Sequence, residues 1–173
     1  HPYLASHNYS DVLDSQFRPG GGICVLESPL REGRLAPADA KLKVVTAAQN
    51  RTIFFGMNQG DKDLKTDNVD GKNPLADVRV RQAINIAINR DAIKKVVMRG
   101  QSAPTGVIMP PFVNGWTKAL DSYPKHDVGK AKGLMKEAGY ADGFGITLNC
   151  PNNRYINDEA ICQAAAGMLG RTV

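Results

Sequence analysis

The sequence has few cysteines and no long apolar run. Its 173 residues include three cysteines, Cys24, Cys150 and Cys162, which are too few and too scattered for a disulfide scaffold or a C-x-x-C zinc motif. No run approaches the ~20 apolar residues that a membrane helix needs. The motifs G-x-S-x-G, H-E-x-x-H, P-loop and G-x-G-x-x-G are also missing. We therefore expect no membrane span, no metal site, no cofactor and no enzymatic activity.

Charge of one sign is not clustered. The 22 lysines and arginines exceed the 17 aspartates and glutamates, which gives a net charge of +5. Such an excess suits an anionic partner when it gathers on one face, but here basic and acidic residues alternate, as in residues 61–65. The pattern predicts that the chain does not bind nucleic acid. With 42% hydrophobic residues and the length of about one domain, the composition is that of an ordinary globular chain.

Strand-like and helix-like patterns alternate along the chain. Residues 1–41 are rich in loop signals, and only residues 23–26 have the character of a strand. Runs of β-branched and aromatic residues follow at 42–46 and 52–57, and residues 146–150 alternate apolar with polar side chains. These patterns predict an α/β fold with helices packed on a mixed sheet.

Four segments carry apolar residues at helical spacing. In the first, these are positions 80, 83, 84, 87 and 88. Glycines just past the second and third segments, Gly100 and Gly139, are expected to end them. The connection between these two segments, residues 101–126, is extended and contains several prolines. The four helices are expected to begin, in chain order, at Asp77, Asp91, Asp127 and Asn157, residue types that suit helix N-termini.

Several motifs occur in the order typical of one protein family. The stretch NPLADVRVRQA at residues 73–83 is followed by AINRDAI at residues 87–93. Three more motifs fit in the same order: TIFFGMN at 52–58, DVGKAK at 127–132 and EAGYADGF at 137–144. Together they resemble the extracytoplasmic solute-binding proteins of peptide and nickel ABC transporters, the bacterial family 5 binding proteins. The resemblance runs from about Leu42 to the last residues.

This resemblance implies a type II periplasmic-binding-protein fold, in which two lobes close on a solute. The family's chains are much longer, so we expect this chain to supply part of that fold. Residues 1–41 stay unplaced or belong to the first lobe, residues 42–58 cross between the lobes, and residues 59–173 form an incomplete second lobe. A periplasmic or other extracytoplasmic location is implied as well. The implied partners are a small-molecule or peptide solute and the permease of an ABC transporter.

Arg154 is the strongest candidate for a ligand contact. It lies between the expected strand 146–150 and the helix expected from Asn157, where α/β proteins commonly bind ligands. Its guanidinium could hold a carboxylate with two hydrogen bonds, and free N–H groups at the helix start would add to the same anion site. The resemblance implies the same role, because in dipeptide-binding members an arginine in the matching loop holds the terminal carboxylate. The alternative is a surface arginine paired with Asp158.

Four other residues complete the expected ligand-binding set. Asn153 and Tyr155 flank Arg154 and could contact peptide amides, although asparagines before helices also serve turns and caps. Asn58 ends the expected strand 52–57 and could face a cleft or only end the strand. Trp116 lies in the connection 101–126, where it could line a pocket or pin the loop to its own domain.

Two pairs of residues stay outside this set. Arg79 and Arg81 belong to the family motif, but arginines near a helix start with Asp77 close by are expected to form structural pairs. Cys150 and Cys162 could form a disulfide in an oxidising periplasm. Two buried free thiols fit the sequence equally well.

Two functions of other classes also need a test. The chain could be a self-sufficient domain that binds another protein through exposed apolar faces. It could also be a copper enzyme of the kind that oxidises polysaccharides, because an N-terminal histidine such as His1 can chelate copper through its amino group and ring. His7 or His126 would then supply the third nitrogen ligand.

Overall fold

The computed structural model describes residues 51–64, 69, 71–111 and 113–172. The chain divides into two units after Thr46, and all described residues belong to the second unit. The segment 1–41 and the strands expected at residues 23–26 and 42–46 therefore lie outside the described residues.

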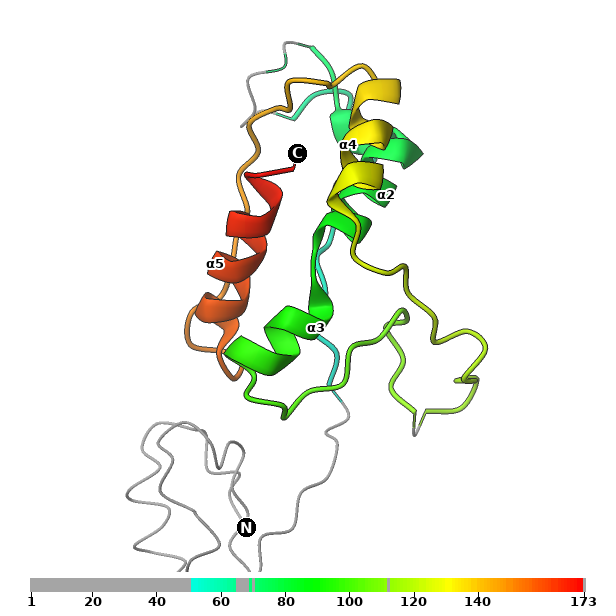
Figure 1. The fold of residues 1–173 in the computed structure, drawn as a ribbon, viewed down its shortest axis with the longest axis vertical. Coiled ribbons are helices and arrows are strands. Elements are labelled where there is room, and N and C mark those ends of the chain that lie inside the picture. Colours follow the sequence, from blue (N-terminus) through cyan, green and yellow to red (C-terminus); the bar gives the residue numbers. More distant parts are fainter. Residues whose placement is uncertain (1–50, 65–68, 70, 112, 173) are drawn as a thin grey trace, which may run out of the picture. The chain divides into compact units, whose positions relative to one another are not determined.

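The described residues form helices joined by extended segments and loops (Figure 1). The helix α2 pairs with α4, and η2 contacts α5. In chain order the elements are η1 (Pro74–Ala76), a 3₁₀ turn; α2 (Val78–Ala87); α3 (Arg90–Ala92); η2 (Ile93–Val97), a π-helical turn; α4 (Val128–Glu137); and α5 (Asp158–Leu169).

Two helices begin at the caps that the sequence predicts. The carboxylate of Asp77 accepts a 2.8 Å hydrogen bond from the backbone N–H of Arg79, and that of Asp127 accepts one of 2.9 Å from Lys130. These bonds satisfy amides that have no carbonyl partner in the first turn. Gly139 follows α4 with a φ of 89°, a conformation that favours glycine, so α4 ends as predicted.

The second predicted helix begins earlier than expected. Asn89 caps it by accepting a 2.9 Å hydrogen bond from the N–H of Ala92, so the prediction of an Asp91 cap is wrong. Both side chains suit a cap, and the local sequence does not rank them. The chain then widens into η2, and the longer turn leaves Val96 74% exposed although it was expected on the apolar side. Gly100 ends the segment as predicted, with a φ of 84°.

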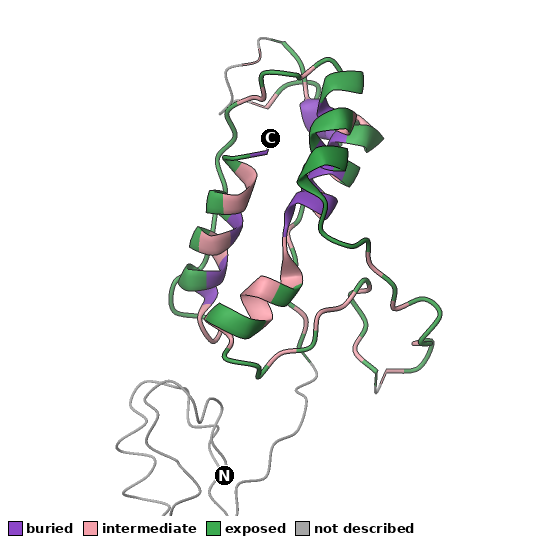
Figure 2. Ribbon diagram, viewed as in Figure 1, coloured by how far each residue is buried: buried purple, intermediate pink, exposed green. Residues whose placement is uncertain are grey.

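The core lies between α2 and α4 and extends to α5. All five apolar positions predicted for the first helix are buried. Figure 2 shows the buried stripe along α2 and another along α5, while exposed residues cover the outer side of α4. Tyr140 and Phe144 pack against this core with their rings edge to face, 5.3 Å apart. The buried hydrophobic residues are Leu75, Val80, Ala83, Ile84, Ile86, Ala87, Ile88, Ala131, Met135, Ile161 and Ala165.

Arg79 and Arg81 are structural, as predicted. Arg79 forms a 2.6 Å ion pair with Asp77 and donates a 2.6 Å hydrogen bond to the carbonyl of Glu137, the last residue of α4. The hydrogen bonds from Arg79 also lower the pKa of Asp77. Arg81 donates to two carbonyl oxygens of η1. The first arginine thus joins α2 to α4, and the second fixes the turn that precedes α2.

The two described segments that were expected to be strands are extended but unpaired. Residues 52–57 and 146–150 contain no strand, and none occurs elsewhere among the described residues. A strand exists only where its backbone is hydrogen-bonded to a neighbour, and no described segment pairs with either one. Several of their apolar side chains are left exposed, namely Ile53, Phe54, Ile146 and Leu148, whereas Phe55 and Met57 are partly buried against the core. The predicted mixed sheet is therefore absent from the part of the chain that the structure describes, whereas the predicted helices are present.

Candidate ligand-binding site

The buried carboxylate of Asp158 fixes the loop that carries Arg154. One oxygen accepts 2.9 Å hydrogen bonds from the backbone N–H groups of Arg154 and Tyr155, and the other accepts one of 2.9 Å from Glu159. Burial alone would raise the pKa of Asp158, but these amide bonds outweigh it and lower the pKa below its ordinary value of 3.8. Asp158 is therefore ionised at neutral pH and holds the loop backbone in place.

The same bonds correct one expectation about the anion site. The N–H groups of Arg154, Tyr155 and Glu159 are occupied by Asp158, so they are not free to add to the binding of a ligand anion. The acidic side chain of Asp158 already accepts hydrogen bonds at the start of this helix, where a negative charge is favourable. An anion bound here therefore cannot use these three amides.

Asn157 joins the loop to a second helix. The helix α5 starts at Asp158, one residue later than predicted, and Asn157 precedes it with a φ of 56° and no capping bond of its side chain. Its side-chain amide instead donates a 3.2 Å hydrogen bond to the carbonyl of Val97 in η2. The loop before α5 is thereby attached to η2.

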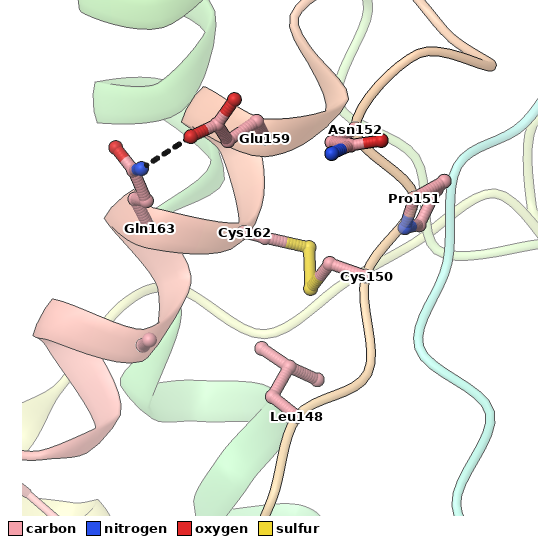
Figure 3. A pocket seen from close by; sticks show the side chains of 8 residues that line it. Leu148, Cys150, Pro151, Asn152, Glu159, Cys162 and Gln163 are labelled. Carbon is pink, nitrogen blue, oxygen red and sulfur yellow. Dashed lines mark hydrogen bonds between the residues drawn. A yellow bond between two sulfur atoms is a disulfide. The ribbon is translucent and has the colours of Figure 1, made fainter.

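A disulfide connects the extended segment before the loop to α5. Cys150 and Cys162 are bonded, with their Cα atoms 6.3 Å apart, so of the two alternatives left by the sequence the disulfide is the one present. Figure 3 shows this bond between α5 and the extended chain. Around it lies a shallow depression of about 300 Å³, where Gln163 donates a 3.0 Å hydrogen bond to Glu159 (Figure 3).

A smaller cavity, of about 170 Å³, lies between α5 and the extended segment 52–55. Pro151 and Cys162 line both this cavity and the depression. Its lining is mostly apolar, and its polar side chains are a hydroxyl, an amide, a phenol and a carboxylate. The lining residues are Thr52, Ile53, Phe54, Phe55, Asn149, Pro151, Tyr155, Asp158, Ile161 and Cys162.

Two arginines contact the ring of Tyr155 at this cavity. The guanidinium carbon of Arg154 lies 5.3 Å from the ring centroid, and that of Arg51 lies 5.4 Å from it. Arg154 does not pair with Asp158 through its side chain, so that alternative is wrong, since only its backbone N–H reaches the carboxylate. Sequence reasoning missed Arg51 because no local pattern relates it to Tyr155, which lies far along the chain. The only sequence signal for Arg51 was its position directly before the apolar run 52–57.

The structure does not bring the other predicted site residues together. Asn153 is exposed in the loop beside Arg154 and lines neither hollow. Asn58 also lines neither, and its side-chain oxygen accepts hydrogen bonds of 3.2 and 3.3 Å from the backbone N–H groups of Gly60 and Asp61. This is a turn-forming role of asparagine. A ligand contact of either asparagine remains a prediction.

Trp116 lies in the connection 101–126 and lines neither hollow. Its indole nitrogen is buried without a hydrogen-bond partner. Asp121, in the same connection, accepts hydrogen bonds of 2.6 Å from the hydroxyl of Thr105 and 2.9 Å from the N–H of Gly106. A Cβ atom at Gly106 would lie 1.9 Å from the carbonyl oxygen of Ser122, so only glycine fits there. A ligand contact of Trp116 remains a prediction.

We expect the connection 101–126 to loosen in acid. The hydrogen bonds from the hydroxyl of Thr105 and the N–H of Gly106 lower the pKa of Asp121 below its ordinary value of 3.8. The ionised carboxylate therefore stabilises the fold above about pH 4, and this stabilisation is lost as the pH falls through the folded-state pKa. The fluorescence of Trp116, the single tryptophan of the sequence, should report the change.

Asp121→Asn should remove this change in fluorescence at acid pH, whereas Asp142→Asn, at an exposed carboxyl, should keep it. The same change in Asp121→Asn would contradict the assignment.

The described residues hold no metal-binding cluster and no membrane-spanning helix. No three side chains of the types that bind metals gather among them, and none of their helices is long and apolar enough to cross a bilayer. His1 and His7 of the copper hypothesis lie outside the described residues. Nδ1 of His126 lies 3.1 Å from the carbonyl oxygen of Ile86, which gives this ring a structural contact near the start of α4.

Comparison of the sequence with models of known protein families shows which family the chain belongs to. Residues 10–172 match the model for bacterial extracellular solute-binding proteins, family 5 Middle. The chain therefore belongs to family 5 of the bacterial extracellular solute-binding proteins. Proteins of this family are extracytoplasmic components of transport systems. The match begins well before Leu42, so the expectation that the resemblance starts there is wrong.

The chain is also similar to individual binding proteins. It is 44% identical over 150 residues to the dipeptide-binding protein of Escherichia coli (strain K12), covering 84% of this chain and 27% of that protein. It is 38% identical over 157 residues to the glutathione-binding protein GsiB of the same strain, and 31% identical over 157 residues to GsiB of Salmonella typhimurium (strain LT2). Each GsiB match covers 88% of this chain and 28% of the relative. The chain thus spans less than a third of the length of these relatives.

Proposed function

We propose that this protein is the solute-binding component of an ABC importer. It binds a short peptide or another small solute that carries a carboxylate, and it delivers this solute to a membrane permease. Binding changes no covalent bond, so the protein is not an enzyme. Membership of the solute-binding family supports the class of function. The similarity to proteins named for binding dipeptides and glutathione supports a peptide-like solute.

The observation that carries the proposal is the state of Arg154. Its side chain is exposed, lies over the ring of Tyr155 and forms no ion pair with any described residue. Its backbone is meanwhile held by the buried carboxylate of Asp158. A guanidinium on a fixed backbone with no acidic partner is suited to a ligand carboxylate, because its planar fork matches both oxygens.

The remaining contacts follow from the same arrangement. Tyr155 borders the cavity, and Asn153 is exposed one residue before Arg154, so both can bind peptide amides. The sequence also makes Asn58 and Trp116 candidate contacts of the solute. Because neither residue lines the depression or the cavity, they would contact the solute outside both. In the whole protein, residues 42–58 cross between two lobes and residues 59–173 contribute to the second lobe. The solute is then enclosed when the lobes close.

A titration of the whole protein with two matched peptides tests the proposal. We expect Ala-Ala to bind at least tenfold more tightly than Ala-Ala-NH₂, because the amide removes the charge that pairs with Arg154. Isothermal titration calorimetry measures both dissociation constants under one set of conditions. Equal affinities would contradict a carboxylate anchor. Binding of neither peptide would contradict a peptide solute.

The exposed apolar side chains favour a second candidate function, that of a self-sufficient domain that binds another protein. Ile53 and Phe54 are 41% and 60% exposed, as a protein-binding face would require. The same side chains would be covered by neighbouring strands in a two-lobed binder. The intact mass of the native protein separates the two, because the chain described here is 18.7 kDa. A much larger mass supports the binder, and a mass of this size supports the interaction domain.

A further inference from the structure

Two guanidinium groups converge on one aromatic ring at the edge of the cavity. Both guanidinium carbons lie within 5.4 Å of the Tyr155 centroid, so they are no more than about 11 Å apart. The two arginines reach the ring from different parts of the chain, Arg51 from the start of the extended segment and Arg154 from the loop before α5. Tyr155 itself lines the cavity between these two parts. The fold therefore brings the two guanidinium groups together, and no local sequence pattern predicts that they meet.

The acidic side chains nearby are already engaged. Asp158, which lines the same cavity, uses both oxygens for backbone N–H groups. Glu159 accepts a hydrogen bond from Gln163. Neither Arg51 nor Arg154 forms an ion pair with a described residue. Arginine does not lose its proton in proteins, so both guanidinium groups keep their positive charge.

The geometry points to Arg51 as a second anion-binding residue, which together with Arg154 makes the site prefer solutes with two carboxylates. Neither guanidinium donates a hydrogen bond to a described residue, so the N–H donors of both are available for a carboxylate. The two carboxylates of a C-terminal glutamate are several ångströms apart, within the span of the two arginines. This inference rests on the proposed function, and it names the substrate class more narrowly, as an acidic peptide.

The preference for a second carboxylate can be measured with an isosteric pair of peptides. In the whole protein we expect Ala-Glu to bind about tenfold more tightly than Ala-Gln, as measured by titration calorimetry. Arg51→Gln should weaken Ala-Glu binding about tenfold and change Ala-Gln binding less than about twofold, so that the preference disappears. Arg51→Lys should keep part of the preference, because the charge remains while the planar fork is lost. Lys132→Gln, which removes an exposed charge on α4, is the matched control and should keep the full preference.

The outcomes distinguish this inference from the proposed function. If the wild-type protein binds Ala-Ala but Arg51→Gln and Arg51→Lys both retain the full preference for Ala-Glu, the second anion-binding residue is overturned and the peptide function stands. If the wild-type protein binds none of the peptides, the proposed peptide function fails and a titration with glutarate decides this inference. Glutarate binding that is lost in Arg51→Gln supports the pair of arginines, and an absence of glutarate binding overturns it.

Discussion

Replacing Arg154 by alanine is expected to raise the dissociation constant for a dipeptide at least tenfold. A hydrogen bond to a charged group contributes about 1.5–3 kcal/mol, and tenfold corresponds to about 1.4 kcal/mol. The fold should not change, because the structural contact of Arg154 runs through its backbone N–H, which alanine keeps. Titration calorimetry of the whole protein with Ala-Ala measures the effect.

A conservative variant and a matched control make this result specific. Arg154→Lys should give an intermediate affinity, because lysine keeps the charge but not the planar fork. Arg171→Ala removes an exposed arginine just past the other end of α5, where its side chain donates to the carbonyl of Gly167. This variant should bind Ala-Ala like the wild type. An unchanged isotherm in Arg154→Ala would remove Arg154 from the site.

Loss of the disulfide is expected to lower the free energy of unfolding by about 3 kcal/mol. The bond between Cys150 and Cys162 closes a loop with a sequence separation of 12 residues, and it restricts the unfolded chain accordingly. The variant with Cys150→Ser and Cys162→Ser should therefore unfold at lower urea concentration. It should also bind Ala-Ala more weakly, because the bond joins the segment before Arg154 to α5 (Figure 3). Urea titration and calorimetry of the whole protein give the two values.

Reduction provides an independent check of the same bond. Dithiothreitol should destabilise the wild-type protein by about as much as the double substitution does, and it should have little effect on the double variant. Cys24→Ser leaves this bond intact and serves as the matched control, with wild-type stability expected. A wild-type protein whose urea transition moves neither with reductant nor with the double substitution would contradict a stabilising role for the bond.

The helices could be predicted because their signals are local. Asp77, Asp127 and Gly139 act within a few residues of themselves, and the structure places all three where the sequence pattern did. Asp91 was assigned the wrong role because Asn89, two residues earlier, offers an equally short acceptor side chain. The widened turn η2 displaced Val96 because a periodicity of 3.6 residues does not describe a π-helical turn.

The strands and the site depended on distant partners. Residues 52–57 and 146–150 have strand-like composition, but a strand also needs a neighbour, and composition does not provide one. Arg154 could be selected from its place before a helix, whereas the approach of Arg51 to the ring of Tyr155 comes from the tertiary fold. The carboxylate of Asp158 accepts hydrogen bonds from the loop amides, and the spacing of residues in the sequence did not indicate these bonds.

The attachment of the loop through Asp158 bears on how specificity can evolve. Asp158 holds residues 154 and 155 by their backbone N–H groups, and every amino acid except proline has such a group. Side chains at these two positions can therefore be exchanged while the loop keeps its conformation. A single invariant acid at position 158 would let one scaffold recognise new solutes by substitution at the two residues that it holds.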